Sequence, residues 1–529
     1  MKKTMLGRFC TLCLALVAAL TMGMSTVSFA AAPDAGDVMR VYNVEKGATV
    51  KAYQIVKEVN GEWKTVDGVK IANPTNPTAA EIAKIAENPP ASSFNLAEGP
   101  NGVYTASGKA AGMYLILVTG TGATLYNPMV VSVDYDEQND SVDATGNFTN
   151  DAYAKSSTPE VKKTNDKTGN TGNATKPTTD NGTSVQVGDT ANFTIETVIP
   201  SYSDHYKDVV FTITDKMDPG LTPPEAEDVV VSVGGDAAPK GKYTVTKKAD
   251  GFEVAFDSAY IKSLASQPEF KRTVEIKYGA KVNENATWNF VPNKNDATIK
   301  FTNKPDGSTG GHKDDSKIYT FGLDANLNGS ATVNNKKTHE IIKLDEKGKA
   351  QTLGYTSEEG KEETVTNALS GATFALYSDK SCAEDKKVAE ATTTSNGYME
   401  MKGLQEGTYY LKETAAPTGY VPSSDVHTVQ ISALYNDNGS LKSYTVNITD
   451  AEGKSHGSTY NATYKSDGSL DKVNVEASSE TLFIKNSRMP GLPSTGGMGT
   501  YIFMIVGAAL MAFAVIAFTK NSKKAKESK

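Results

Sequence analysis

Two side chains of opposite charge are predicted to point into an apolar core of this chain. Lys343 shares a face with Ile341, and Glu413 shares a face with Leu411, because successive residues of a strand point to opposite sides of a sheet. Loss of solvation lowers the pKa of a buried lysine, which then offers a free amine, and raises the pKa of a buried carboxyl group, which then stays protonated. A free amine beside a protonated acid could attack a carboxamide and form an amide bond. The alternative is that Lys343 is an ordinary solvated strand lysine.

A second motif with chemical meaning lies near the C-terminus, where residues 492–496 read Leu-Pro-Ser-Thr-Gly. An uncharged apolar run over residues 501–518 follows, and its length of about 18 residues is enough for a marginal bilayer span. Proline restricts φ at position 493 and bends the peptide, which suits an element that must enter an enzyme groove. The basic residues behind the run predict that this end stays in the cytoplasm; they are Lys520, Lys523, Lys524, Lys526 and Lys529.

Pentapeptide, apolar run and basic tail in this order resemble the cell-wall sorting signal of Gram-positive bacteria. The resemblance implies that a sortase, a cysteine transpeptidase, cuts after Thr495 and holds this residue as a thioester until an amine takes over the acyl group. An ordinary single-span membrane protein is the alternative, but it leaves the pentapeptide unexplained. The residues of the implied sortase motif are Leu492, Pro493, Ser494, Thr495 and Gly496.

The N-terminus has the pattern of a secretory signal. Basic residues at the start precede an apolar stretch over residues 9–24, and small residues at Ser28 and Ala30 offer a cleavage site. Residues 1–30 are therefore predicted to be a signal peptide, and the protein is expected to be secreted.

Composition excludes several classes of function. Beyond the signal peptide the chain keeps one cysteine, Cys382, so no intramolecular disulfide is possible. The net charge of −8 argues against a nucleic-acid partner. The five histidines are scattered, with no pair at metal-ligand spacing. The sequence therefore predicts no cofactor and no metal.

Between the two ends, short alternating segments are separated by Gly, Asn and Pro turns, the pattern of β-sandwich domains. One helix is expected over residues 79–87, where Thr78 can cap and Glu81 stands at the capping-box position. The expected fold class is all-β, with three tandem immunoglobulin-like sandwiches followed by a transmembrane helix. The predicted divisions are a signal peptide (1–30), an N-terminal domain (31–155), a middle domain (156–316), a C-terminal domain (317–488) and a sorting segment (489–529).

The C-terminal domain carries the most specific segments: ALSGATFALY, then GTYYLKETAAPTGY, then a closing FIKN. They resemble the collagen-adhesin B-type repeat of Gram-positive surface proteins. The resemblance implies a covalent bond between Lys343 on the first strand and Asn486 on the last, assisted by Glu413. Folding would supply the proximity, for which effective molarities of about 10⁵ M or more are attainable. Ammonia leaves and no turnover occurs, so this is self-modification rather than enzyme activity.

The middle domain offers a weaker parallel to the middle domain of Gram-positive backbone pilins. Lys163 shares a face with Val161, Asp215 lies in the segment VVFTITDKMDPGLT, and Asn303 ends the segment KFTN. The resemblance implies a second lysine–asparagine bond, between Lys163 and Asn303, assisted by Asp215. Lys162 is the competing lysine, although alternation points it outward, and an ordinary hairpin aspartate and turn asparagine are the alternative.

An acceptor lysine is expected at the end of the N-terminal domain. Residues 153–156 read Tyr-Ala-Lys-Ser and partly resemble the pilin motif of backbone pilins, whose usual core reads Tyr-Pro-Lys-Asn. The resemblance implies that Lys155 attacks the Thr495 thioester of the next subunit. The alternative is a linker lysine, and the neighbours Lys162, Lys163 and Lys167 weaken the case.

Together these resemblances imply a structural backbone subunit of a sortase-assembled covalent pilus, anchored to the cell wall and supporting adhesion. The expected partners are a pilus-type and a housekeeping sortase, other copies of the chain, tip and base pilins, and peptidoglycan. The alternative is a monomeric wall-anchored adhesin, in which Lys155 has no role.

Overall fold

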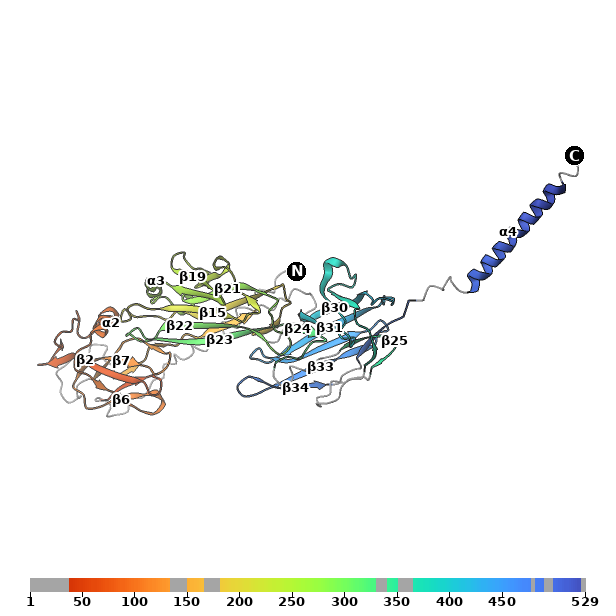
Figure 1. Cartoon of the computed structure of the whole chain (residues 1–529). Coiled ribbons are helices and arrows are strands. Elements are labelled where there is room, and N and C mark those ends of the chain that lie inside the picture. Colours follow the sequence, from red (N-terminus) through yellow and green to blue (C-terminus); the bar gives the residue numbers. More distant parts are fainter. Residues whose placement is uncertain are drawn as a thin grey trace, which may run out of the picture.

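The computed structural model describes residues 38–133, 150–165, 181–329, 340–350, 365–476, 481–489 and 498–524. These residues form three β-sandwich units that follow one another in an elongated arrangement, with a single long helix at the C-terminal end (Figure 1). The predicted all-β class is therefore confirmed. The predicted signal peptide and the pentapeptide at 492–496 lie outside the described residues.

The first unit packs a four-stranded sheet, ordered β10-β1-β6-β5, against a five-stranded sheet, ordered β3-β2-β7-β9 with β4 beside β2. The predicted helix is α2 (Ala79–Glu87), and Thr78 and Glu81 form the expected reciprocal capping box. A 3₁₀ turn, η1 (Pro100–Gly102), precedes β6. The strands are β1 (Met39–Tyr42), β2 (Thr49–Val59), β3 (Glu62–Thr65), β4 (Phe94–Asn95), β5 (Ala97–Glu98), β6 (Tyr104–Ala106), β7 (Gly112–Thr119), β9 (Met129–Val133) and β10 (Asp151–Tyr153).

The second unit consists of two six-stranded sheets. Along their long strands, buried residues alternate with more exposed ones, so that one face of each sheet lies in the core. One sheet contains β12 (Val161–Asn165), β14 (Thr190–Val198), β16 (Leu221–Thr222), β17 (Val230–Val233), β18 (Asp236–Ala237) and β21 (Thr273–Val282). The other contains β13 (Gly182–Ser184), β15 (Phe211–Met217), β19 (Tyr243–Lys248), β20 (Gly251–Phe256), β22 (Asn293–Thr302) and β23 (Thr309–Tyr319). Short helical turns α3 (Ser258–Ser263), η2 (Ala226–Asp228) and η3 (Glu269–Lys271) connect them.

The third unit has a seven-stranded sheet, ordered β28-β27-β30-β31-β32-β33-β34, facing a three-stranded sheet, ordered β26-β25-β35. Its first long strand, β25, pairs in parallel with its last strand, β35. The elements are β24 (Phe321–Leu323), β25 (Ile341–Ala350), β26 (Val365–Ala368), β27 (Thr373–Tyr377), η4 (Glu384–Lys386), β28 (Lys387–Thr392), β29 (Met401–Leu404), β30 (Gly407–Ala415), β31 (Val426–Tyr435), β32 (Leu441–Thr449), β33 (Ser455–Tyr464), β34 (Leu470–Glu476) and β35 (Leu482–Asn486).

The first and second units share a packed junction. Strands β8 (Leu125–Tyr126) and β11 (Ser156–Ser157) pair there, and Leu125 belongs to the hydrophobic core of the second unit. The Tyr206 hydroxyl donates to the Tyr126 carbonyl at 2.7 Å across this junction. The segment that contains Lys155 therefore lies at the contact between the first and second units.

The second and third units are also joined closely. Strand β23 continues through Tyr319, past the predicted boundary at 316/317, and Ile318 still packs in the core of the second unit. Only the buried residue Thr320 separates β23 from β24. Phe290, from the loop before β22, packs in the core of the third unit at 5.3 Å from the Tyr444 ring. A loop of the second unit therefore contributes an aromatic side chain to the core of the third.

The C-terminal helix α4 (Met498–Lys524) contains a 19-residue segment, Tyr501–Thr519, with a mean hydropathy of 2.5. It is long and apolar enough to cross a membrane. This finding agrees with the predicted transmembrane helix behind the pentapeptide.

Candidate functional site

The first candidate site lies inside the third unit, where Lys343, Glu413 and Asn486 meet. The Lys343 ammonium donates to Glu413 Oε2 at 2.9 Å and also to Asn486 Oδ1, and Asn486 Nδ2 donates to Glu413 Oε1 at 2.7 Å. The three contacts close a ring in which amine, acid and carboxamide each touch the other two. The structure thus brings together the three residues that the sequence analysis grouped.

The strands explain why this group is buried. Lys343 on β25 and Asn486 on β35 belong to the same three-stranded sheet, and Glu413 on β30 reaches them from the facing sheet. All three side chains are almost completely buried, and the Phe374 ring lies 5.5 Å from the Lys343 ammonium. Burial lowers the pKa of Lys343, while the hydrogen bond to Glu413 opposes this shift. The Lys343 amine therefore loses its proton more readily than a lysine in water.

The second candidate site lies between the two sheets of the second unit. The Lys163 ammonium donates to Asp215 Oδ2 and, at 2.6 Å, to the hydroxyl oxygen of Tyr278. The Tyr278 hydroxyl in turn donates to Asp215 Oδ2 at 2.6 Å. Burial lowers the pKa of Lys163 and raises the pKa of Asp215, although each partner opposes the shift of the other. Both directions favour a neutral amine beside a neutral acid.

Asn303 does not lie in this second cluster. It directly follows β22 at the junction with the first unit, where its side-chain amide donates to the Gly122 carbonyl at 2.9 Å. The asparagine beside the cluster is Asn295, also on β22, whose Nδ2 donates to the Tyr278 hydroxyl at 2.9 Å. Asn295 is fully buried. The structure therefore brings Lys163 and Asp215 together as expected, but places Asn295 rather than Asn303 beside them.

Strand alternation could have identified Asn295. On β22 the inward positions run Asn293, Asn295, Ala297, Ile299 and Phe301. An inward asparagine within an apolar stripe is a stronger signal than an asparagine at a strand end, because a buried amide needs partners. Tyr278 was missed for another reason: an inward tyrosine on β21 resembles an ordinary core residue until its hydroxyl contacts are known.

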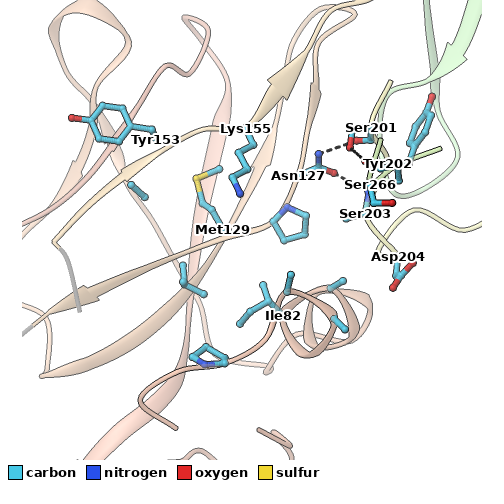
Figure 2. Close-up of a pocket in the computed structure, with 18 residues that line it drawn as sticks. Ile82, Asn127, Met129, Tyr153, Lys155, Ser201, Tyr202, Ser203, Asp204 and Ser266 are labelled. Carbon is cyan, nitrogen blue, oxygen red and sulfur yellow. Dashed lines mark hydrogen bonds between the residues drawn. The ribbon is translucent and has the colours of Figure 1, made fainter. Parts of the chain in front are cut away.

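Lys155 lies between β10 and β11 and its side chain is exposed. Its backbone carbonyl accepts a hydrogen bond from the backbone N–H of Asn127 at 3.0 Å, which holds the segment against the first unit. The side chain borders a groove of about 710 Å³ between helix α2 of the first unit and residues 201–204 of the second. Figure 2 shows Lys155 beside Met129 with its amine directed to the groove, and Tyr153 at the far side of the view from Ser201 and Asp204.

Three family models match separate parts of the chain. A model described as a T6 antigen Ig-like domain matches residues 34–159, a prealbumin-like fold domain matches residues 358–449, and the LPXTG cell wall anchor motif matches residues 484–528. The matched anchor motif and the tandem sandwiches are the features of the cell wall-anchored LPXTG surface proteins of Gram-positive bacteria.

The chain is similar over its whole length to one characterised protein of this class, the trypsin-resistant surface T6 protein of Streptococcus pyogenes serotype M6. The two are 26% identical over 576 residues, which cover 97% of this chain and 99% of the relative. The solved structure of the T6 backbone pilin, described as a modular three-domain protein, matches with a TM-score of 0.55 and 21% identity over 86% of this chain and 98% of that chain. The full-length major pilin SpaD from Corynebacterium diphtheriae matches with a TM-score of 0.44 and 17% identity over 86% of this chain and 97% of that chain. The anchor motif, the prealbumin-like domain and the similarity to the T6 protein along nearly the whole chain together support a Gram-positive LPXTG backbone pilin.

Proposed function

We propose that this chain is the backbone subunit of a covalent pilus, in which Lys155 of one subunit is joined to Thr495 of the next. A sortase would release residues 496–529 and hold the Thr495 carbonyl as a thioester. The Lys155 amine would then attack this carbonyl, forming an amide bond and releasing the enzyme thiol. Polymer growth in this scheme needs one acyl donor and one amine per subunit.

The observation that carries this proposal is the position of Lys155. An acceptor amine must be reachable by an enzyme that already holds a large subunit. Lys155 is exposed at the junction of the first and second units, beside an open groove. The groove offers apolar side chains such as Ile82 and Met129 (Figure 2), which suit a peptide that contains leucine and proline. The anchor motif at residues 484–528 supplies the matching acyl donor.

The decisive experiment identifies the bond between subunits. Fibres released from the surface of the producing cells would be digested, and the cross-linked peptides analysed by mass spectrometry. We expect a branched peptide that joins the Thr495 carbonyl to the Lys155 side-chain nitrogen. If Thr495 were found joined only to peptidoglycan, the chain would be a monomeric wall-anchored adhesin instead.

The two buried lysine clusters support a second part of the proposal, which is that the second and third units each carry an internal amide bond. In the third unit the Lys343 amine would attack the side-chain carbonyl of Asn486 while Glu413 moves the protons. In the second unit the Lys163 amine would attack Asn295, with Asp215 as the acid. Each reaction converts an amine and a carboxamide into a substituted amide and ammonia, so atoms and charges balance without any cofactor.

The identity of the acceptor asparagine in the second unit can be tested by substituting two candidates separately: Asn295 on β22, and Asn303 directly after it. The mature ectodomain, residues 31–495, should be lighter than its sequence mass by two molecules of ammonia. We expect the intact mass of Asn295→Ala to fall below its sequence mass by one ammonia instead of two, because no carboxamide then lies beside Lys163. Asn303→Ala is the matched control and should lose both, since Asn303 contacts Gly122 at the unit junction. The reverse pattern in the intact masses would restore Asn303 as the partner.

A further inference from the structure

Tyr278 occupies the centre of the second cluster. Its hydroxyl contacts the three groups that take part in the proposed reaction: it accepts from Lys163 at 2.6 Å and from Asn295 Nδ2 at 2.9 Å, and it donates to Asp215 at 2.6 Å. The ring is held by Phe193, stacked at a centroid distance of 5.5 Å, and by Phe252, edge-on at 4.8 Å. The hydroxyl is therefore held in place by packing on both sides of the ring.

In the cluster of the third unit, the acid contacts both the lysine and the asparagine amide directly. There Glu413 uses one carboxylate oxygen for Lys343 and the other for the amide of Asn486. In the second unit the acid is an aspartate, which is shorter by one methylene, and the amide of Asn295 donates to the Tyr278 hydroxyl instead. The hydroxyl thus stands between the short acid and the amide nitrogen that has to leave.

Two buried oxygens of the cluster are left without a partner. Among the described residues, Asp215 Oδ1 and Asn295 Oδ1 accept no hydrogen bond. Asp215 lies opposite Ala297 in the β15–β22 register, which makes Asn295 its diagonal neighbour on the same inward face. A proton on Asp215 Oδ1, donated to Asn295 Oδ1, would satisfy both oxygens and polarise the carbonyl that Lys163 must attack.

We propose that Tyr278 is a catalytic residue of the cross-link in the second unit, relaying a proton from Asp215 to the leaving nitrogen of Asn295. This inference rests on the proposed bond between Lys163 and Asn295. The Lys163 ammonium first gives a proton to Asp215, and the neutral amine adds to the Asn295 side-chain carbon. The acid then donates to the Tyr278 oxygen as the tyrosine proton passes to Asn295 Nδ2. The carbon–nitrogen bond breaks and ammonia departs, while the Asp215 carboxylate takes the extra proton from the former lysine nitrogen. The neutral amide, the neutral acid and the tyrosine hydroxyl remain.

The test is Tyr278→Phe in residues 31–495, recovered unfolded from inclusion bodies before either bond has formed, then refolded alongside the wild type prepared in the same way and sampled over time by intact mass. The third-unit bond is an internal reference, because its cluster contains no contact with Tyr278. We expect the third unit to lose its ammonia at the wild-type rate. The loss of ammonia from the second unit should slow by about 100-fold or more, the usual contribution of a positioned acid or base. Peptide mapping assigns each loss to its unit.

A matched control separates this role from the loss of a buried hydroxyl. Tyr202 is equally buried in the same unit, and its hydroxyl donates to the Thr302 carbonyl at 2.9 Å, so Tyr202→Phe should leave both rates unchanged. Site-specific replacement of Tyr278 by difluorotyrosine keeps the hydroxyl in place but makes it more acidic. This change should restore the bond and shift the pH dependence of its rate, which a purely structural role would not do.

Each outcome bears on a different statement. If the wild type loses only one ammonia, the proposed bond in the second unit is wrong and Tyr278 has no reaction to assist. If the wild type loses two and Tyr278→Phe forms both bonds at the same rate, the bond stands but the role of Tyr278 is wrong. The same holds if difluorotyrosine restores the rate with an unchanged pH profile.

Discussion

Cells that produce the Lys155→Ala variant are expected to lose the ladder of high-molecular-weight species from hot detergent extracts of their walls. The variant lacks the amine that would take over the Thr495 acyl group from the sortase. The sandwich units should still fold, because the Lys155 side chain is exposed and the contact that ties its segment down uses the backbone carbonyl. An exposed substitution of this kind changes stability by no more than about 0.5 kcal/mol. Immunoblots with an antibody against the ectodomain measure the ratio of polymer to monomer.

Lys162→Ala provides the matched control. Lys162 is also exposed and lies a short way along the chain on β12, but its side chain belongs to the outer face of the second unit. We expect this variant to keep the full ladder. A ladder that persists in Lys155→Ala and disappears in Lys162→Ala would move the acceptor role to Lys162. A ladder that is unchanged in both variants would contradict the proposed polymer bond.

Strand alternation was sufficient to predict which side chains point inward. Lys343, Glu413 and Lys163 were assigned to the apolar faces of their strands, and each is buried in the structure. This success has a simple physical basis, because a two-residue period leaves only two faces and one of them must be apolar in a sandwich.

Alternation could not predict which inward residues meet. Asn303 was expected from the resemblance to the middle domain of backbone pilins, yet it contacts the first unit, whereas Asn295 lies next to Tyr278. The register between β15 and β22 and the distance between the two sheets decide this, and neither can be derived from the sequence of one strand. Phe290 illustrates the same limit on a larger scale, since a loop of the second unit supplies a core residue of the third.

Both proposed internal bonds lie in the part of the chain that a pilus would load. Tension applied between Lys155 and Thr495 passes through the second and third units, while the core of the first unit precedes Lys155 in the sequence. In the third unit the bond would connect strand β25 to strand β35, which are already paired in parallel. Parallel strands pulled from opposite ends must shear all of their hydrogen bonds together, and a covalent bond between them would carry the load instead.

Removal of the third-unit bond should give the largest change in stability. Lys343 and Asn486 are 143 residues apart, and closing a loop of this size removes about 5 kcal/mol of chain entropy from the unfolded state by analogy with a disulfide. Asn486→Ala takes away the carbonyl that the amine attacks but leaves the Lys343–Glu413 ion pair in place. We expect the intact mass to retain one ammonia and the melting temperature of this unit to fall by about 10–20 °C, following the usual relation for a unit of this size.

Two further variants show whether the bond itself is the cause. Lys485→Ala changes an exposed side chain on the same strand, so it should keep both the mass loss and the melting temperature. Glu413→Gln keeps the size of the buried side chain but cannot carry a proton between amine and amide, so it should retain the ammonia and melt as low as Asn486→Ala. If Asn486→Ala melted at a lower temperature although the wild type had never lost ammonia from this unit, the stability would come from packing and hydrogen bonds around Lys343. The covalent bond would then be absent from this sandwich.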